Sequence, residues 1–156
     1  MSRRTARETA LQVLFQVNIT KDDPKPVLDY TFAEFAVPEP SREFAEYLVM
    51  GTLARLNEID AAIQTAAKEW HLDRMANVDR NILRLAVFEL FYCPEIPGSV
   101  TINEAVELAK AFSGNEAGKF VNGILGALQA QAGKQKEAKF TPTDLVAADE
   151  PTGEQK

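Results

Sequence analysis

The segment from Ile82 to Tyr92 constrains the fold of this chain more than any other. Only Arg84 and Glu89 are charged within it, so a helix over residues 78–92 is apolar on nearly every side. A helix of this kind lies in the middle of a fold, or it exposes one face to a partner. The sequence therefore predicts a helical protein in which this segment either lies at the centre or carries an interface with a partner.

Apolar residues recur at spacings of three and four along most of the remaining chain, and the alternation typical of strands is almost absent. This period predicts further helices before the central one. Their apolar faces are Ala6, Ala10, Val13, Leu14 and Val17 in the first, Val27, Leu28, Phe32 and Phe35 in the second, and Phe44, Leu48, Leu56, Ile59, Ile63, Ala67 and Trp70 in a long third helix with Ser41 as its N-cap.

Two helices are expected after the central one. Thr101 and Glu104 have the spacing of a capping box, and Ser-Gly-Asn at residues 113–115 separates this helix from the last. The sequence thus predicts an all-α, compact helical bundle of six or seven helices in one domain, residues 1–133. Residues 134–156 lose the apolar period and carry mixed charge, which predicts a disordered C-terminal tail.

Charge and hydropathy exclude several classes of protein. The formal net charge of −6 argues against a protein that coats nucleic acid non-specifically, although a local basic patch is compatible with it. No apolar run approaches the roughly 18 residues needed to span a bilayer. The N-terminus has no continuous apolar block of the kind found in signal peptides. We therefore expect a cytoplasmic protein that makes no contact with a membrane.

Residues that could carry catalysis or hold a metal are scarce. The single cysteine, Cys93, and the single histidine, His71, cannot assemble a Cys/His metal cluster. The glycines form no G-x-x-x-x-G-K-[ST] phosphate loop. Glu104 and Glu107 share a helix face, but Lys110 follows Glu107 by three residues, as in ordinary surface pairing. The sequence predicts no catalytic residue, no metal site and no cofactor.

Positive charge is concentrated at the N-terminus, in Arg3, Arg4 and Arg7. At the start of a helix this charge is unfavourable, because the helix N-terminus is itself partly positive, and an external anion would relieve it. Arg4, Arg7, Leu11 and Phe15 fall within an arc of about 80° on a helical wheel, away from the middle of the apolar face. Guanidinium groups followed by an aromatic ring suit RNA phosphates and stacked bases. The alternative is a solvated basic end with Phe15 packed into the core.

Four segments of the sequence resemble the NusB family of transcription antitermination factors. They are Ala6-Arg7-Glu8-x-Ala10-Leu11-Gln12-x-Leu14-Phe15-Gln16, Val78-Asp79-Arg80-Asn81-Ile82-Leu83-Arg84-Leu85-Ala86-Val87-Phe88-Glu89-Leu90, Pro97-x-x-Val100-x-Ile102-Asn103-Glu104-Ala105-Val106-Glu107-Leu108-Ala109-Lys110, and Lys119-Phe120-Val121-Asn122-Gly123. Their order and spacing are specific, and the match covers about Arg3 to Leu128.

The resemblance implies a fold of two small helical subdomains and a role in suppressing premature termination on ribosomal RNA operons. Members of the family bind boxA, a short single-stranded element of the nascent transcript. They do so together with a small-subunit ribosomal protein that acts as the factor NusE. The resulting complex joins RNA polymerase through other Nus factors.

The resemblance also assigns roles to positions of this chain. It assigns RNA contacts to Arg3, Arg4, Arg7 and Phe15 on the first helix, and to Asn115, Glu116 and Lys119 at the loop and helix start that border the RNA surface. It places Asp79 on the side that meets the ribosomal-protein partner. Ile102, Phe112, Phe120 and Asn122 match core positions.

Two features leave alternatives open. The basic stretch is shorter than in some relatives, which implies low RNA affinity without the partner. The aromatic residues of segment 91–94 are either buried or exposed for self-association as a homodimer. Competing functions are a helical adaptor that binds only protein, and an RNA-binding domain related to the NusB-like part of ribosomal RNA methyltransferases.

A chain truncated after Gly133 should still unfold cooperatively and keep its RNA binding. The reason is that residues 134–156 have no periodic apolar face and nearly balanced charge. Thermal unfolding followed by circular dichroism measures this directly. Loss of the cooperative transition on truncation would show that the tail is part of the folded domain.

Overall fold

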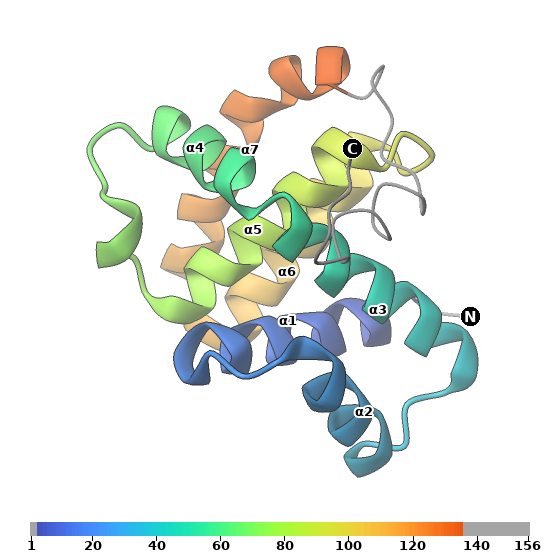
Figure 1. The fold of residues 1–156 in the computed structure, drawn as a ribbon. Helices are drawn as coiled ribbons and strands as arrows, with labels where there is room; N and C mark the ends of the chain where they lie inside the picture. Colours follow the sequence, from blue (N-terminus) through green and yellow to red (C-terminus); the bar gives the residue numbers. More distant parts are fainter. Residues whose placement is uncertain (1–2, 136–156) are drawn as a thin grey trace, which may run out of the picture.

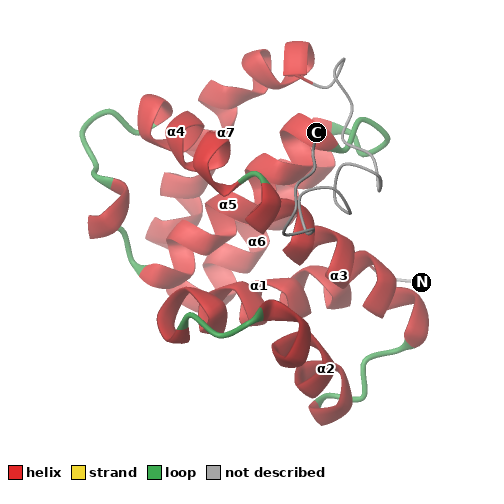
Figure 2. Cartoon of the chain, viewed as in Figure 1, coloured by secondary structure: helices red, strands yellow, loops and turns green. Residues whose placement is uncertain are grey.

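Residues 3–135, with the side chains of residues 3–130, are described in the computed structural model. In this range the chain forms seven α-helices, one short 3₁₀ turn and no β-strand (Figures 1 and 2). The elements are α1 (Arg3–Thr20), α2 (Pro24–Glu34), α3 (Glu39–Ala54), α4 (Leu56–Ala66), η1 (Leu72–Arg74), α5 (Asn77–Tyr92), α6 (Gly98–Ser113) and α7 (Asn115–Gln135). The predicted all-α fold is confirmed.

Helix α5 lies at the centre of the bundle (Figure 1). It contacts α1 and α3, which pack with α2 into one helical group, and it also contacts α4, α6 and α7, which form the other. Every residue of α5 from Asn81 to Tyr92 is buried. The segment that is nearly free of charge is therefore the element that holds the two groups together.

Helix α3 approaches α5 closely at one glycine. Gly51 of α3 lies directly against the ring of Phe88, so that a Cβ atom at this position would overlap the ring. Tyr47, one turn earlier, packs edge-on against Phe88 with the ring centroids 5.5 Å apart. Glycine is required here because only the absence of a side chain lets the α3 backbone reach the ring.

A buried ion pair joins α1 to α5 and α6. Arg7 Nε and Nη2 each donate a 2.8 Å hydrogen bond to the carboxylate of Glu89, and the hydroxyl of Thr101 donates a third at 3.1 Å. The side chains of Arg7 and Glu89 are only 5% and 2% exposed. Burial lowers the pKa of Arg7, but the hydrogen bonds and charge of Glu89 raise it more, so the guanidinium stays charged.

This placement corrects the expectation that Arg7 lies on an exposed strip of the first helix. Arg7 and Leu11 are buried along with the apolar face that includes Ala6, Ala10 and Val13. The buried face of α1 is wider than its apolar period predicts, because α1 packs against α2 and α3 and also against α5. A helix with neighbours on several sides buries more of its surface than its apolar face alone.

Other boundaries also differ from the sequence-based prediction. The long third helix is two helices, α3 and α4, separated at Arg55, and Trp70 lies beyond α4. Ser41 does not cap α3, because the helix already begins at Glu39 with Pro40 in its first turn. Proline is favoured there, since its missing N–H group would have no helical partner.

The expected capping box of the following helix is not used as one. Helix α6 begins at Gly98, so Thr101 and Glu104 both lie inside it. Thr101 donates to the buried Glu89, and Glu104 pairs with Arg4 of α1. Both side chains therefore bind residues of other helices instead of capping α6.

Several residues near the α6–α7 end lie differently from the expected core. Phe112 is 52% exposed and Asn122 is exposed, whereas Ile102 and Phe120 are partly buried against the core.

The aromatic side chains of Phe91 and Tyr92, at the end of α5, are buried. Of the two alternatives for that segment, burial or exposure for self-association, the structure shows the first.

Helix α7 extends to Gln135, past the predicted domain boundary at residue 133. The remainder of the predicted tail lies outside the described residues. None of the described helices is long and apolar enough to cross a membrane. Within the same residues no group of three His, Cys, Asp or Glu side chains is arranged to hold a metal ion.

Arg7→Ala should lower the free energy of unfolding by about 3–5 kcal/mol, because it leaves the buried Glu89 carboxylate without its cation. Urea unfolding at neutral pH measures this. Arg3→Ala is the control: it removes an exposed guanidinium from the same end of α1, which rests on the Phe44 ring, and should change stability by about 1 kcal/mol or less. Equal effects of the two substitutions would contradict a structural role specific to Arg7.

Candidate nucleic-acid interface

The first turn of α1 presents two of the three predicted arginines at the surface. Arg3 is exposed, and its guanidinium carbon lies 4.2 Å from the centroid of the Phe44 ring. Arg4 donates two 3.0 Å hydrogen bonds, from Nε and Nη2, to the two carboxylate oxygens of Glu104 on α6. Arg7 is buried, so it cannot reach a ligand at the surface.

The Arg4–Glu104 pair is partly open to solvent, with side-chain exposures of 50% and 18%. The hydrogen bond from Arg4 lowers the pKa of Glu104, and the positive charges of Arg4 and Arg7 also lower it. The same contact raises the pKa of Arg4. Both groups are therefore charged at neutral pH, and any phosphate that binds Arg4 competes with Glu104.

Phe15 is half buried and opens onto a hollow between α1 and α2. The hollow has a volume of about 420 Å³, and its apolar lining includes Ile19, Tyr30 and Phe35, which are 54%, 64% and 59% exposed. Phe15 is thus neither fully packed in the core nor part of a strip with Arg7. The exposure of Phe35 differs from its expected place on the buried face of the second helix, because α2 ends at Glu34 and Phe35 follows it.

The residues predicted around the start of α7 lie together. Asn115, Glu116 and Lys119 are exposed in its first turns, with Lys119 Nζ 3.7 Å from a Glu116 carboxylate oxygen. Glu116, Lys119 and Asp79 line one hollow of about 840 Å³, whose aromatic wall is formed by Trp70 and Phe120. Two of the residues assigned by resemblance to RNA, Glu116 and Lys119, therefore share one cavity with Asp79, which was assigned to the protein partner.

Asp79 has an unusual environment in that hollow. Its Oδ1 atom is buried and makes no hydrogen bond within the described part of the chain. Buried polar atoms are normally paired, so the Oδ1 atom of Asp79 has an acceptor position that the described residues leave open. Trp70, 57% exposed, packs edge-on against Phe120 with ring centroids 5.8 Å apart.

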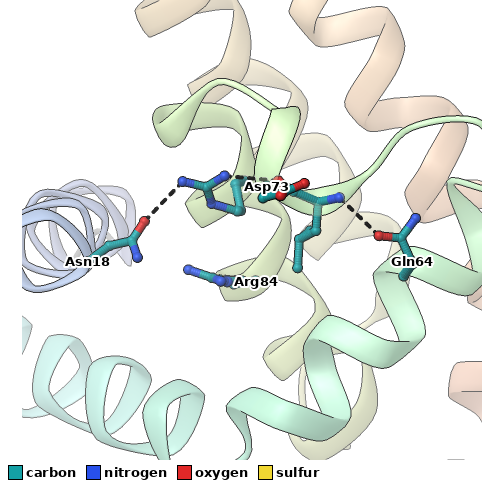
Figure 3. A pocket seen from close by; sticks show the side chains of 6 residues that line it. Asn18, Gln64, Asp73 and Arg84 are labelled. Carbon is teal, nitrogen blue, oxygen red and sulfur yellow. Dashed lines mark hydrogen bonds between the residues drawn. The ribbon is translucent and has the colours of Figure 1, made fainter.

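A second polar pocket lies between α1, α4, η1 and α5, and the sequence did not predict it (Figure 3). Its volume is about 460 Å³, and its lining includes Asn18, Gln64, Asp73, Arg80 and Arg84. The sequence signal that could have indicated it is the spacing of the two arginines, four residues apart on a helix that is otherwise almost uncharged. That spacing places both guanidinium groups on one helix face.

The structure therefore brings the predicted site residues together in part. Arg4 at the first turn of α1 pairs with Glu104 near the middle of α6, whereas Lys119 lies just after the C-terminal end of α6. Roughly 14 Å of helix separates Glu104 from Ser113 at that end. Asn115, Glu116, Lys119 and Asp79 are grouped at the C-terminal end of α6.

The sequence profile of the NusB family matches residues 4–130 of this chain. Transcription antitermination protein NusB of Desulforamulus reducens is 56% identical over 128 residues, which covers 82% of this chain and 90% of that protein. The protein of the same name from Desulfitobacterium hafniense is 51% identical over 139 residues, covering 88% and 94%.

Solved structures agree with the sequence relatives. T. maritima NusB superimposes with a TM-score of 0.78 at 36% identity, covering 84% of this chain and 92% of that chain. A chain in the crystal structure of antitermination factors NusB and NusE in complex with dsRNA superimposes with a TM-score of 0.77 at 31% identity, covering 83% and 96%. On both the sequence and the fold, this chain belongs to the NusB family of transcription antitermination proteins.

Proposed function

We propose that this chain binds boxA-type single-stranded RNA of nascent ribosomal RNA transcripts together with the small-subunit ribosomal protein that acts as NusE. The complex joins RNA polymerase with other Nus factors and suppresses premature termination. The observation that carries this proposal is the similarity, over 83% of the chain, to a structure that contains NusB, NusE and dsRNA. The role is one of binding rather than catalysis, and its place is the cytoplasm, where transcripts are made.

The RNA contacts that we propose are Arg3 and Arg4 on α1, Phe15 on the same helix, and Asn115, Glu116 and Lys119 at the start of α7. All of these side chains are exposed or half-exposed. Arg7 acts differently, because its pair with Glu89 fixes the position of α1 and so the position of Arg3 and Arg4. Glu116 is an acid, so its contact would be with a hydrogen-bond donor of the RNA rather than with a phosphate.

For the ribosomal partner we propose the surface around Asp79. The buried Oδ1 atom of this residue lacks a donor among the described residues, and a partner N–H group would supply one. Charge-assisted hydrogen bonds of this type are roughly twice as strong as neutral ones. Because Asp79 shares its hollow with Glu116 and Lys119, the partner would lie next to the bound RNA.

The isolated chain should bind boxA-type RNA much more weakly than its mixture with the ribosomal protein. The reason is electrostatic: the net charge is −6, and Arg4 and Arg7 are already paired with carboxylates. A gel shift with and without the ribosomal protein measures the difference. Equal affinity in both lanes would contradict the proposal, and a mixture that binds no RNA would favour the protein-only adaptor.

Arg4→Ala should weaken RNA binding by the mixture and reduce the dependence of log K on log salt by about 0.7, the contribution of one phosphate contact on a single strand. Glu104→Gln should do the opposite, because it removes the carboxylate that competes for Arg4. Fluorescence anisotropy across a salt series separates the two variants. If Glu104→Gln weakens binding, the pair serves to position Arg4 and does not compete with RNA.

A further inference from the structure

The guanidinium of Arg80 is fixed in place by neutral acceptors only. Its Nη1 donates to the carbonyl oxygens of Leu72 at 2.8 Å and Met75 at 3.3 Å. Its Nη2 donates to Asn18 Oδ1 at 3.3 Å, and Figure 3 shows this bond as a dashed line from the labelled Asn18. No carboxylate of the described residues lies within 4 Å of it. Arg80 is therefore a half-buried cation that is held rigidly and has no counter-ion in the described part of the chain.

The other arginines that point toward the fold differ from Arg80 in this respect. Arg7, Arg4 and Arg84 each donate two hydrogen bonds to a single carboxylate, on Glu89, Glu104 and Asp60 respectively. Burial lowers the pKa of Arg80, and the positive charge of the neighbouring Arg84 lowers it further. The carboxylates of Asp60 and Asp73 raise this pKa, but by less, so the net shift is downward. A charge taken out of water needs a partner, and within the described fold Arg80 has none.

A second donor lies beside this guanidinium. Asn18 Oδ1 accepts hydrogen bonds from both Arg80 and Asn81, which fixes the orientation of the amide. The NH₂ group of Asn18 then makes no hydrogen bond within residues 3–135, and Asn18 lines the pocket. A guanidinium and an amide NH₂ converging on a pocket of about 460 Å³ form a site for an oxyanion.

The position of the pocket on α1 favours an RNA phosphate as the anion. Asn18 follows Phe15 by three residues on α1, so the two side chains lie on neighbouring parts of one helix face. A single RNA strand offers a base to an aromatic ring and a phosphate to a nearby cation. Among the described residues that line the pocket, Asp73 is the one carboxylate, and it is exposed and opposes the binding of an anion.

We propose that Arg80 and Asn18 bind a phosphate of the RNA backbone in the pocket between α1, α4 and α5. This inference rests on the proposed function and extends it: the RNA reaches the last turn of α1 and the start of α5, beyond the N-terminal arginines. Gln64 supports the site indirectly, because its amide binds the Trp70 carbonyl oxygen and the Leu72 N–H and so holds the turn that carries the Arg80 acceptors.

The test compares Arg80→Gln with Arg42→Gln, both in the full chain mixed with the ribosomal protein. Arg42 is the matched control because it also donates to a backbone carbonyl, Val37 O at 2.7 Å, but lies on α3, away from the pocket. Anisotropy with boxA-type RNA over a salt series should show about tenfold weaker binding for Arg80→Gln and a salt slope reduced by about 0.7. Arg42→Gln should change neither quantity, and Arg80→Lys should keep most of the slope.

Asp73→Asn provides an independent readout that does not depend on the stability of an Arg80 variant. Removing this carboxylate should tighten RNA binding severalfold at low salt and have little effect at high salt, because the interaction is screened. Asp29→Asn, an equal charge change at an exposed position of α2, should have a smaller effect. Equal effects of the two would overturn the proposal.

Four further results would also overturn it. If Arg80→Gln weakens RNA binding with the salt slope unchanged, Arg80 only supports the turn at residues 72–75. If Arg80→Gln abolishes binding to the ribosomal protein in the absence of RNA, the pocket receives a carboxylate of that protein instead. If the wild-type mixture binds no RNA, the proposed function fails together with this inference. If the wild-type mixture binds RNA and Arg80→Gln binds it equally well, only this inference fails.

Discussion

The carboxylate of Glu89 is buried in the last turn of an apolar helix, and the helices that pack against it must supply groups that neutralise it. Water cannot reach the group, since the residues of α5 from Asn81 to Tyr92 are all buried. Arg7 supplies two hydrogen bonds and Thr101 a third, so α1 and α6 must each approach α5 at one particular register. Apolar packing tolerates small shifts between helices, whereas three hydrogen bonds to one carboxylate do not. The ion pair thereby fixes where the first turn of α1, with its exposed arginines, stands relative to α6.

Neighbouring arginines of one basic stretch acquire different roles through their partners. Arg3 rests on an aromatic ring at the surface, Arg4 is shared between a carboxylate and solvent, and Arg7 is part of the core. The number of cations available to a ligand is therefore smaller than the sequence suggests. In a chain of net charge −6, this limits the electrostatic attraction for RNA and explains why a second protein would be needed.

The central helix, the first apolar face and the all-α class could be predicted from the sequence, because hydrophobic period depends on residues close together in the chain. What could not be predicted depends on residues far apart. Arg7 and Glu89 are 82 positions apart, and Arg4 and Glu104 are 100 apart, so no local pattern reveals that these side chains are paired. The Thr101 and Glu104 capping box was wrong for the same reason. Arg80 was interpreted only as part of a family motif, since its lack of a counter-ion among the described residues is a property of the folded pocket.

The position of Asp79 suggests how RNA and protein recognition are linked. Its buried Oδ1 atom, which has no hydrogen-bond partner in the described range, lies in the hollow that also contains Lys119, a residue proposed to meet the RNA. Its neighbour Arg80, one residue later on α5, turns instead toward Asn18 and the polar pocket. Successive residues on a helix point about 100° apart, so the start of α5 presents an acceptor on one side and a cation on the other. The partner protein would donate a hydrogen bond to Asp79, and the RNA strand would place a phosphate against Arg80. Both ligands would therefore contact the same turn of α5. Because Arg80 is already held in place by the turn at residues 72–75, neither ligand has to order its site, and contact between the two ligands on this turn would link their binding.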